Sequence, residues 1–176
     1  RVARHANDRT RSFGVAFDGC TLPGKSEPLF TVPDGRMAVG LGIHGEPGID
    51  ETDVPTADEL AQLFVSRLLD EVPDGVELSG ARVGPILNGL GSVKYEELFV
   101  VYRSVDRLLR AAGVEVVDPE VGPVGDGAVR PQRGPAAAHR VEERLDPHDV
   151  QIGVLLAGET GCGQVLGGGR RPDRHR

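Results

Sequence analysis

Hydrophobic and polar residues in the first part of the chain alternate as in β-strands, and from about residue 56 they recur with the period of an α-helix. Alternating apolar residues predict a strand over residues 12–17, and residues 1–11 predict the end of a helix. Short apolar runs predict strands over residues 29–32 and 36–41. Between these two runs, Pro33-Asp34-Gly35 is a strong signal for a hairpin turn.

A helical period begins at Thr56 and continues to about Asp70. Thr56 and Glu59 have the spacing of a capping box, in which the threonine oxygen accepts from the third helical amide and the glutamate reaches back. The apolar positions recur every three or four residues and therefore predict one buried face. This face carries Leu60, Leu63, Phe64, Leu68 and the stem of Arg67.

A second helix is predicted between two strands. Residues 82–87 read as a buried strand, Ser92 is the expected helix cap, and the helix runs to Ala112, where Gly113 ends it. Residues 114–117 then form the next strand, so this part favours a parallel pairing. The expected core stripe of the helix is Leu98, Tyr102, Val105 and Leu109. These patterns predict an α/β fold with a mixed sheet covered by helices.

The segment 39–48 is the chemically suggestive part of the chain. Its glycines remove side chains on both sides of His44, and Pro47 restricts the backbone, so a strand should break into a tight turn that presents one imidazole. An imidazole titrates near neutral pH, which makes His44 a candidate nucleophile or acid/base. The alternative is a turn histidine that hydrogen-bonds its own backbone.

Three other features each allow a purely structural and a functional interpretation. The acidic linker 49–55 is expected to be a solvated loop rather than a metal site, because it lacks the order of known calcium loops. Cys20 is expected to be a packed thiol rather than a nucleophile. The Asn88-Gly-Leu-Gly91 loop either binds an anion on its amides or is a close-packed turn, and the pattern favours neither.

Composition narrows the class of protein. A chain of 176 residues with 39% hydrophobic residues can form one domain, and 4% aromatics make its core aliphatic. The net charge of −7 argues against nucleic acid or a membrane surface as a partner. No apolar run is long enough to span a bilayer and no signal peptide is evident, so we expect a cytoplasmic protein. The two cysteines and the scattered histidines define no metal site.

Residues 122–176 differ from the rest of the chain. They are rich in glycine, arginine and proline and contain no aromatic residue. We therefore predict a division into residues 1–121 and an irregular, low-complexity tail, which packs poorly and contributes little to the core. A frameshift in a GC-rich gene is the leading account of this composition, and a natural low-complexity tail is the alternative. The tail's glycines at 158–163 match no nucleotide-binding spacing.

The segment from Gly42 to Gly48 (Gly-Ile-His-Gly-Glu-Pro-Gly) resembles the signature of the dihydroxyacetone (glycerone) kinase family, in its substrate-binding K domain. Three more stretches agree with that family in the same order: residues 14–24, 88–91 and 96–102. Residues 2–121 are thus similar to the second half of the K domain. The rest of the family pattern, including the first half of the domain, has no counterpart in this chain.

The resemblance implies a role for His44 as the residue that adds to a substrate ketone and forms a covalent hemiaminal. It also implies that Gly42, Gly45 and Glu46 lie in the substrate site. The substrate would be dihydroxyacetone or another short ketose. No residue of this chain is expected to bind a cofactor or a metal. The phosphoryl donor would be ATP with magnesium, or a phosphorylated carrier protein, on a partner L-type domain or subunit.

Competing functions remain at this point. An enzyme component of glycerone kinase type is the first, although this segment alone is expected to be inactive. A non-catalytic ketose-binding or regulatory module is the second, and an inactive gene fragment is the third. The family also implies a homodimer.

Overall fold

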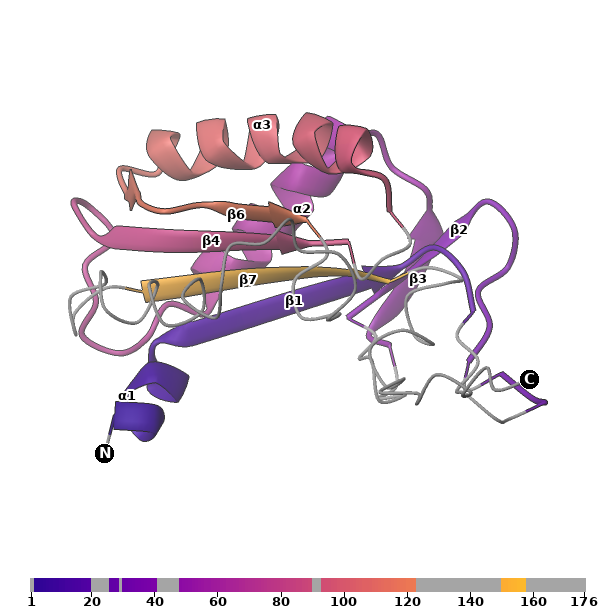
Figure 1. Ribbon diagram of the computed structural model, residues 1–176, viewed down its shortest axis with the longest axis horizontal. Helices are drawn as coiled ribbons and strands as arrows, with labels where there is room; N and C mark the ends of the chain where they lie inside the picture. Colours follow the sequence, from indigo (N-terminus) through magenta and orange to yellow (C-terminus); the bar gives the residue numbers. More distant parts are fainter. Residues whose placement is uncertain are drawn as a thin grey trace, which may run out of the picture.

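The computed structural model describes residues 2–19, 26–28, 30–40, 48–89, 93–122 and 150–157. These residues form a mixed seven-stranded sheet with helices packed on it, which confirms the predicted fold class (Figure 1). The strand order is β3-β2-β1-β7-β4-β5, and β6 also pairs with β4. The elements are α1 (Val2–Asp8), β1 (Thr10–Ala16), β2 (Arg36–Val39), β3 (Asp50–Asp53), α2 (Ala57–Asp70), β4 (Arg82–Asn88), α3 (Tyr95–Ala111), β5 (Glu115–Val116), β6 (Glu120–Gly122) and β7 (Val150–Ala157).

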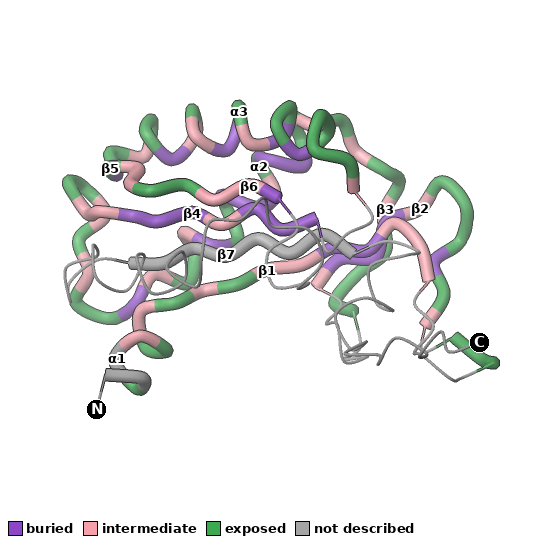
Figure 2. The backbone as a smooth tube through the Cα atoms, viewed as in Figure 1, coloured by how far each residue is buried: buried purple, intermediate pink, exposed green. Residues whose placement is uncertain are grey.

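The main core lies between the sheet and the helices α2 and α3. Phe64 of α2 and Leu98 of α3 are fully buried there, together with Val15 of β1 and Leu87 of β4. Alternation along β1 explains the two sides of the sheet: Val15 belongs to this core, whereas its neighbour Ala16 belongs to a smaller cluster. Figure 2 shows the buried side of α3 turned toward the sheet and its exposed side turned outward.

Helix α2 begins as the sequence predicts. The Thr56 hydroxyl oxygen accepts a hydrogen bond from the Glu59 amide at 3.3 Å, and the Glu59 carboxylate accepts one from the Thr56 amide at 2.9 Å. The capping box is therefore complete. Of the predicted face, Leu60, Phe64 and Leu68 are buried. The Arg67 guanidinium lies 6.0 Å from the centre of the Phe13 ring, a cation–π contact that agrees with the expected snorkelling.

Helix α3 ends as predicted but begins later. Gly113 has a φ of +86°, the left-handed conformation that ends a helix. The prediction that Ser92 caps the helix is wrong, because the N-cap residue is Lys94, whose amide donates to the Glu97 carboxylate at 3.1 Å. A glutamate in the first turn has thus taken over the capping role. Strand β5 pairs with β4 in parallel, which confirms the predicted strand–helix–strand unit.

Two local predictions need correction. Residues 49–55 are not only a loop, because Asp50–Asp53 form the edge strand β3, antiparallel to β2. Acidic residues are poor strand formers, but Arg36 in β2 is bonded to Glu51 and Asp53 and offsets their charge. The predicted strand over 29–32 is reduced, among its described residues, to a single bridge at Phe30.

The tail is also different from the prediction in one segment. Strand β7 lies between β1 and β4 and pairs with both in parallel, with Leu156 opposite Val15 and Val154 opposite Leu87. The expectation of an irregular tail is therefore wrong for Val150–Ala157, whereas the expectation that residues 122–176 contribute little to the core stays a prediction. A short apolar run suffices for a strand covered on both edges, and aromatic residues are not required. The proposed division at residue 121 and the frameshift account stay predictions.

No described helix is both long enough and apolar enough to cross a membrane.

Candidate functional site

The predicted substrate-binding segment joins the two strands of the β2–β3 hairpin. β2 ends at Val39 and β3 begins at Asp50, so residues 40–49 form the connection between them. Gly42, His44, Gly45 and Glu46 all fall in this connection and lie outside the described residues. Their assignment to the substrate site therefore stays a prediction. The structure describes the residues at both ends of the connection.

Backbone hydrogen bonds hold both ends of the connection. The Gly40 amide donates to the Gly14 carbonyl of β1 at 2.8 Å, and the Ile49 amide donates to the Val39 carbonyl at 2.8 Å. The first bond ties the connection to β1, and the second closes the hairpin across its two strands. The His44 segment consequently leaves and re-enters the sheet at fixed points.

Gly40 has a backbone conformation that favours glycine, and the side chain of Ile49 lies against it. Its φ is +71°, in the left-handed region that side chains disfavour. A Cβ atom built on Gly40 would lie 2.5 Å from the Cδ1 atom of Ile49, far inside van der Waals contact. Ile49 is nevertheless 67% exposed, so its side chain covers the glycine rather than filling the core. Gly40 and Ile49 together define how the chain turns into the connection.

Charged residues tie the two strands of the hairpin together. The Arg36 Nε atom lies 3.1 Å from the Glu51 carboxylate, and its Nη2 atom donates to the Glu51 carbonyl at 2.9 Å. The remaining guanidinium nitrogen, Nη1, bonds the carboxylate of Asp53, the residue paired with Arg36 in the sheet. Hydrogen bonds to Glu51 and then to Asp53 raise the pKa of Arg36 above its usual value. Arg36 thus links β2 to β3 on the solvent-exposed side of the hairpin and offsets the charges of Glu51 and Asp53.

The glycine-rich stretch that follows β1 also packs tightly. The Gly19 amide donates to the Asp18 carboxylate at 2.6 Å. A Cβ atom on Gly19 would lie 2.8 Å from the Phe30 carbonyl oxygen, so a larger residue would displace the backbone there. Cys20 lies outside the described residues. The described part of residues 14–24 therefore has a clear structural role.

The loop after β4 has its own close contacts. Asn88 is only 6% exposed at the carboxyl end of β4, and the Gly89 amide donates to the Gly122 carbonyl at 3.3 Å. A Cβ atom on Gly89 would lie 2.9 Å from a Leu98 methyl group. These contacts favour the close-packed turn at Gly89. Leu90 and Gly91 lie outside the described residues, so the anion-binding alternative is untested for them.

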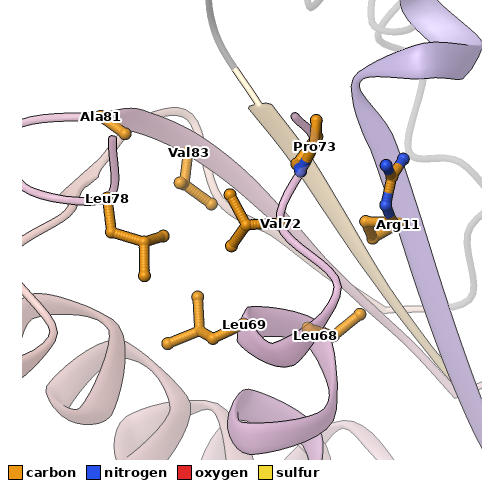
Figure 3. Close-up of a pocket in the computed structure, with 8 residues that line it drawn as sticks. All are labelled: Arg11, Leu68, Leu69, Val72, Pro73, Leu78, Ala81 and Val83. Carbon is orange, nitrogen blue, oxygen red and sulfur yellow. The ribbon is translucent and has the colours of Figure 1, made fainter. Parts of the chain in front are cut away.

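Cofactor and metal chemistry find no support in the described part of the chain. Within it, no three histidine, cysteine, aspartate or glutamate side chains come together to hold a metal ion. A small cavity lies where the end of α2 meets β1 and β4, lined by apolar side chains and Arg11 (Figure 3). Its volume of about 10 Å³ accommodates no more than a water molecule, and therefore neither a ketose nor a nucleotide.

The sequence pattern did not single out three residues that hold the ends of the β2–β3 connection: Arg36, Gly40 and Ile49. A signal for Arg36 existed, since a cation opens the strand after the Pro33-Asp34-Gly35 turn and carboxylates follow on the other side of the connection. Gly40 was noted only as one of several glycines. Its contact with Ile49 depends on the hairpin closing, which residue spacing alone does not reveal.

Comparison with known proteins identifies the family. The Dak1 domain model matches residues 1–125. L-erythrulose kinase of Pectobacterium atrosepticum is 67% identical over 122 residues, which are 69% of this chain and 21% of that protein. The dihydroxyacetone-binding subunit DhaK of PTS-dependent dihydroxyacetone kinase 2 from Listeria innocua is 37% identical over 122 residues, 69% of this chain and 36% of that subunit.

A solved structure agrees with these relatives. The dihydroxyacetone kinase operon co-activator DhaQ superposes with a TM-score of 0.52 at 27% identity, over 64% of this chain and 34% of that one. The chain thus spans about a fifth to a third of the proteins it matches. The family match covers both strands of the hairpin, the connection between them, and the helices that support the sheet. The chain belongs to the Dak1 domain family of kinase substrate-binding domains.

Proposed function

We propose that this chain is the part of a ketose kinase substrate-binding domain that holds the substrate through His44. The observation that carries this proposal is the Dak1 match over residues 1–125, because it includes the whole β2–β3 hairpin in which His44 is placed. The framing contacts at Gly40 and Ile49 support it, since a covalent anchor needs a backbone with defined entry and exit points. Gly42, Gly45 and Glu46 would lie beside the bound ketose.

The proposed chemistry is addition to a carbonyl group. A neutral imidazole nitrogen of His44 attacks the carbonyl carbon of the ketose, a C–N bond forms, and the C=O π bond breaks. The carbonyl oxygen takes up a proton and the imidazole loses its N–H proton, so the product is a neutral hemiaminal. A polyol such as glycerol has no carbonyl and cannot be held in this way. The bond therefore selects ketoses and fixes the terminal hydroxyl for phosphoryl transfer.

We propose erythrulose, a four-carbon ketose, as the substrate rather than dihydroxyacetone. Identity to the L-erythrulose kinase is 67%, against 37% to the dihydroxyacetone-binding subunit, over segments of the same length. The phosphoryl donor would come from elsewhere, as ATP with magnesium or as a phosphorylated carrier protein on an L-type domain or subunit.

A chimeric enzyme tests the proposal. The matching 122 residues of the Pectobacterium L-erythrulose kinase are replaced by those of this chain, which are 67% identical. The chimera should phosphorylate erythrulose, and native mass spectrometry should find a ketose adduct that His44→Ala abolishes. Glycerol should give no adduct in either protein. Full kinase activity in a folded His44→Ala chimera would refute the role of His44.

A second candidate function is a ketose-binding regulatory module without catalysis. The structural match to an operon co-activator favours it. The same chimera separates the two candidates, because a regulatory module should form the adduct without supporting phosphoryl transfer. Turnover of erythrulose by the chimera would exclude the purely regulatory function.

A further inference from the structure

An isoleucine lies at the point where the connection that carries His44 rejoins the sheet. Val39 and Asp50 are the last paired residues of the β2–β3 hairpin, so Gly40 and Ile49 are the first residues beyond the paired part of each strand. The Ile49 side chain is largely exposed and therefore contributes little to the core. Its contact with Gly40 is the feature that bears on the site.

The Ile49 side chain lies along the backbone of Gly40. A Cβ atom built on Gly40 would meet three atoms of this side chain, Cδ1 at 2.5 Å, Cγ1 at 2.6 Å and Cβ at 3.4 Å. The absence of a side chain at residue 40 allows this close approach. The two ends of the connection are thus in contact through a side chain, in addition to the backbone hydrogen bonds that each of them makes.

The charged contacts of the hairpin lie at a different place. Arg36 is paired with Asp53 at the end of the hairpin away from the connection, and its bonds run to Glu51 and Asp53. Exposed ion pairs of this kind contribute little and are screened by salt. The contact between Ile49 and Gly40 lies beyond the last pair, next to the connection itself, and does not depend on charge.

We propose that Ile49 is a positioning residue for His44, because its side chain keeps the two ends of the connection in one relative position. This inference rests on the proposed function, in which His44 adds to the ketose carbonyl. Such an addition requires a defined approach of nitrogen to carbon, and a misplacement of about 1 Å can cost on the order of 10²-fold. A β-branched side chain suits the role, since few χ1 rotamers are open to it. Ile49 acts through the backbone of the connection.

The proposal predicts different effects on substrate binding and on turnover. Loss of positioning lowers the fraction of enzyme that carries the ketose as a hemiaminal, which raises KM. Once the hemiaminal has formed, the same covalent bond holds the terminal hydroxyl, so kcat should change little. In the chimeric erythrulose kinase, we expect Ile49→Ala to raise KM about tenfold and to lower the adduct yield in native mass spectrometry. Ile49→Val keeps the β-branch and should retain a KM close to that of the unmodified chimera.

Val54→Ala is the matched control. Val54 is also an exposed apolar residue, but it follows the other end of β3, where its amide donates to the Gly35 carbonyl at 3.2 Å. This variant should leave KM unchanged. Both side chains are exposed, so both alanine variants should melt close to the unmodified chimera. A purely structural role of Ile49 would therefore not produce the difference in KM.

A double-variant cycle tests the contact itself. Gly40→Ala places a methyl group where the Ile49 side chain lies, and should raise KM as well. Because the two substitutions act on one contact, the double variant should have a KM no higher than the larger of the two single effects. Single effects that multiply in the double variant would contradict a shared contact and overturn the inference.

The outcomes separate this inference from the proposed function. If the unmodified chimera forms the adduct and Ile49→Ala leaves KM and adduct yield unchanged, the inference is wrong and the proposed function stands. The same holds if Val54→Ala raises KM as much as Ile49→Ala does. If the folded, unmodified chimera forms no adduct and does not turn over erythrulose, both are wrong, because there is then no anchored ketose to position.

Discussion

At the scale of single residues, Gly40 and Gly35 separate the effect of backbone conformation from that of packing. Their φ angles are +71° and +74°, but a Cβ atom meets Ile49 at Gly40 and nothing within 4 Å at Gly35. We expect Gly35→Ala to cost about 1 kcal/mol for its left-handed backbone. Gly40→Ala should cost a further ~0.5–1 kcal/mol, because the exposed Ile49 side chain must turn away from the added methyl group. Chemical denaturation measures both.

The contact with Ile49 can be tested within the same series. If overlap is the cause, Ile49→Ala should recover most of the additional loss in the Gly40→Ala background, because the clashing methyl and methylene groups are gone. In the Gly35→Ala background it should recover nothing. Equal losses from the two glycine substitutions would contradict the account of the hairpin base.

Tyr102 shows how a buried polar atom without a partner behaves. Among the described residues its hydroxyl group has no hydrogen-bond partner, and burial followed by the charge of Asp106 raises the pKa of the phenol to about 12. An unfolded chain releases this proton near the usual pKa of 10.0, whereas the folded chain keeps it up to a pKa of about 12. The free energy of unfolding should therefore fall as pH rises from about 10 to about 12.

Replacement by phenylalanine provides the check. Tyr102→Phe removes a hydroxyl group that makes no hydrogen bond, so we expect a change in unfolding free energy of less than about 1 kcal/mol at neutral pH. The alkaline loss of stability should become smaller, and the ultraviolet absorbance change of the most basic phenol should disappear. A loss of several kcal/mol at pH 7 would mean that the hydroxyl has a partner.

At the scale of elements, the start of α2 depends on its capping box. Thr56→Ala removes the oxygen that accepts from the Glu59 amide, and should cost about 1 kcal/mol of stability. Ser66→Ala is a suitable control, because the Ser66 hydroxyl donates only to carbonyls within the helix. The midpoint of urea unfolding compares the two. An equal or larger effect of Ser66→Ala would argue against the capping role.

The contact between α2 and α3 predicts a dependence on acid. Hydrogen bonding by the Ser104 hydroxyl, with a further contribution from the charge of Arg103, holds the pKa of Asp58 below its usual value of 3.8. A carboxyl group with a lowered pKa stabilises the fold above its unfolded pKa, and this contribution is lost as pH falls through the folded value. Melting temperatures of wild type should therefore fall more steeply below about pH 4 than those of Ser104→Ala. Parallel curves would refute the coupling.

At the scale of the whole molecule, β7 joins two parts of the sheet that are otherwise separate. The strands β3, β2 and β1 lie on one side of it, and β4, β5 and β6 on the other. We expect amide hydrogens of Val150–Ala157 to exchange as slowly as those of β4, because both strands are paired on two sides. Hydrogen exchange with mass spectrometry makes this comparison, with β3 as the edge-strand control.

A proline in β7 tests the same point by substitution. Leu155→Pro removes one backbone donor from a strand paired on both edges, and should lower the melting temperature far more than Leu155→Ala. If the two variants melt alike and the segment exchanges at once, residues 122–176 are the poorly packed tail that their composition first indicated.

Local patterns were enough to predict most of the helices and turns. The capping box at Thr56, the stop at Gly113 and the turn at Pro33-Asp34-Gly35 involve residues a few positions apart, so their interactions are visible in the sequence. The strand predicted before that turn is only a bridge at Phe30. The same reasoning singled out the connection that carries His44, because closely spaced glycines around one histidine have a direct conformational meaning. The family resemblance came from the same stretch, and the Dak1 match confirmed it.

The sequence by itself thus determined the helices, the strands β1, β2, β4 and β5, and the family, whereas the strands β3, β6 and β7, the strand order and the strand partners were decided only in the tertiary structure. Val150–Ala157 pairs with strands more than 60 positions earlier, and composition in its neighbourhood gave no indication of them. Arg36 bonds the carboxylates of β3 across the hairpin, and the Ile49 side chain lies against Gly40. Such contacts form only when distant segments meet, since sheet pairing is non-local and depends on what the rest of the chain leaves unpaired.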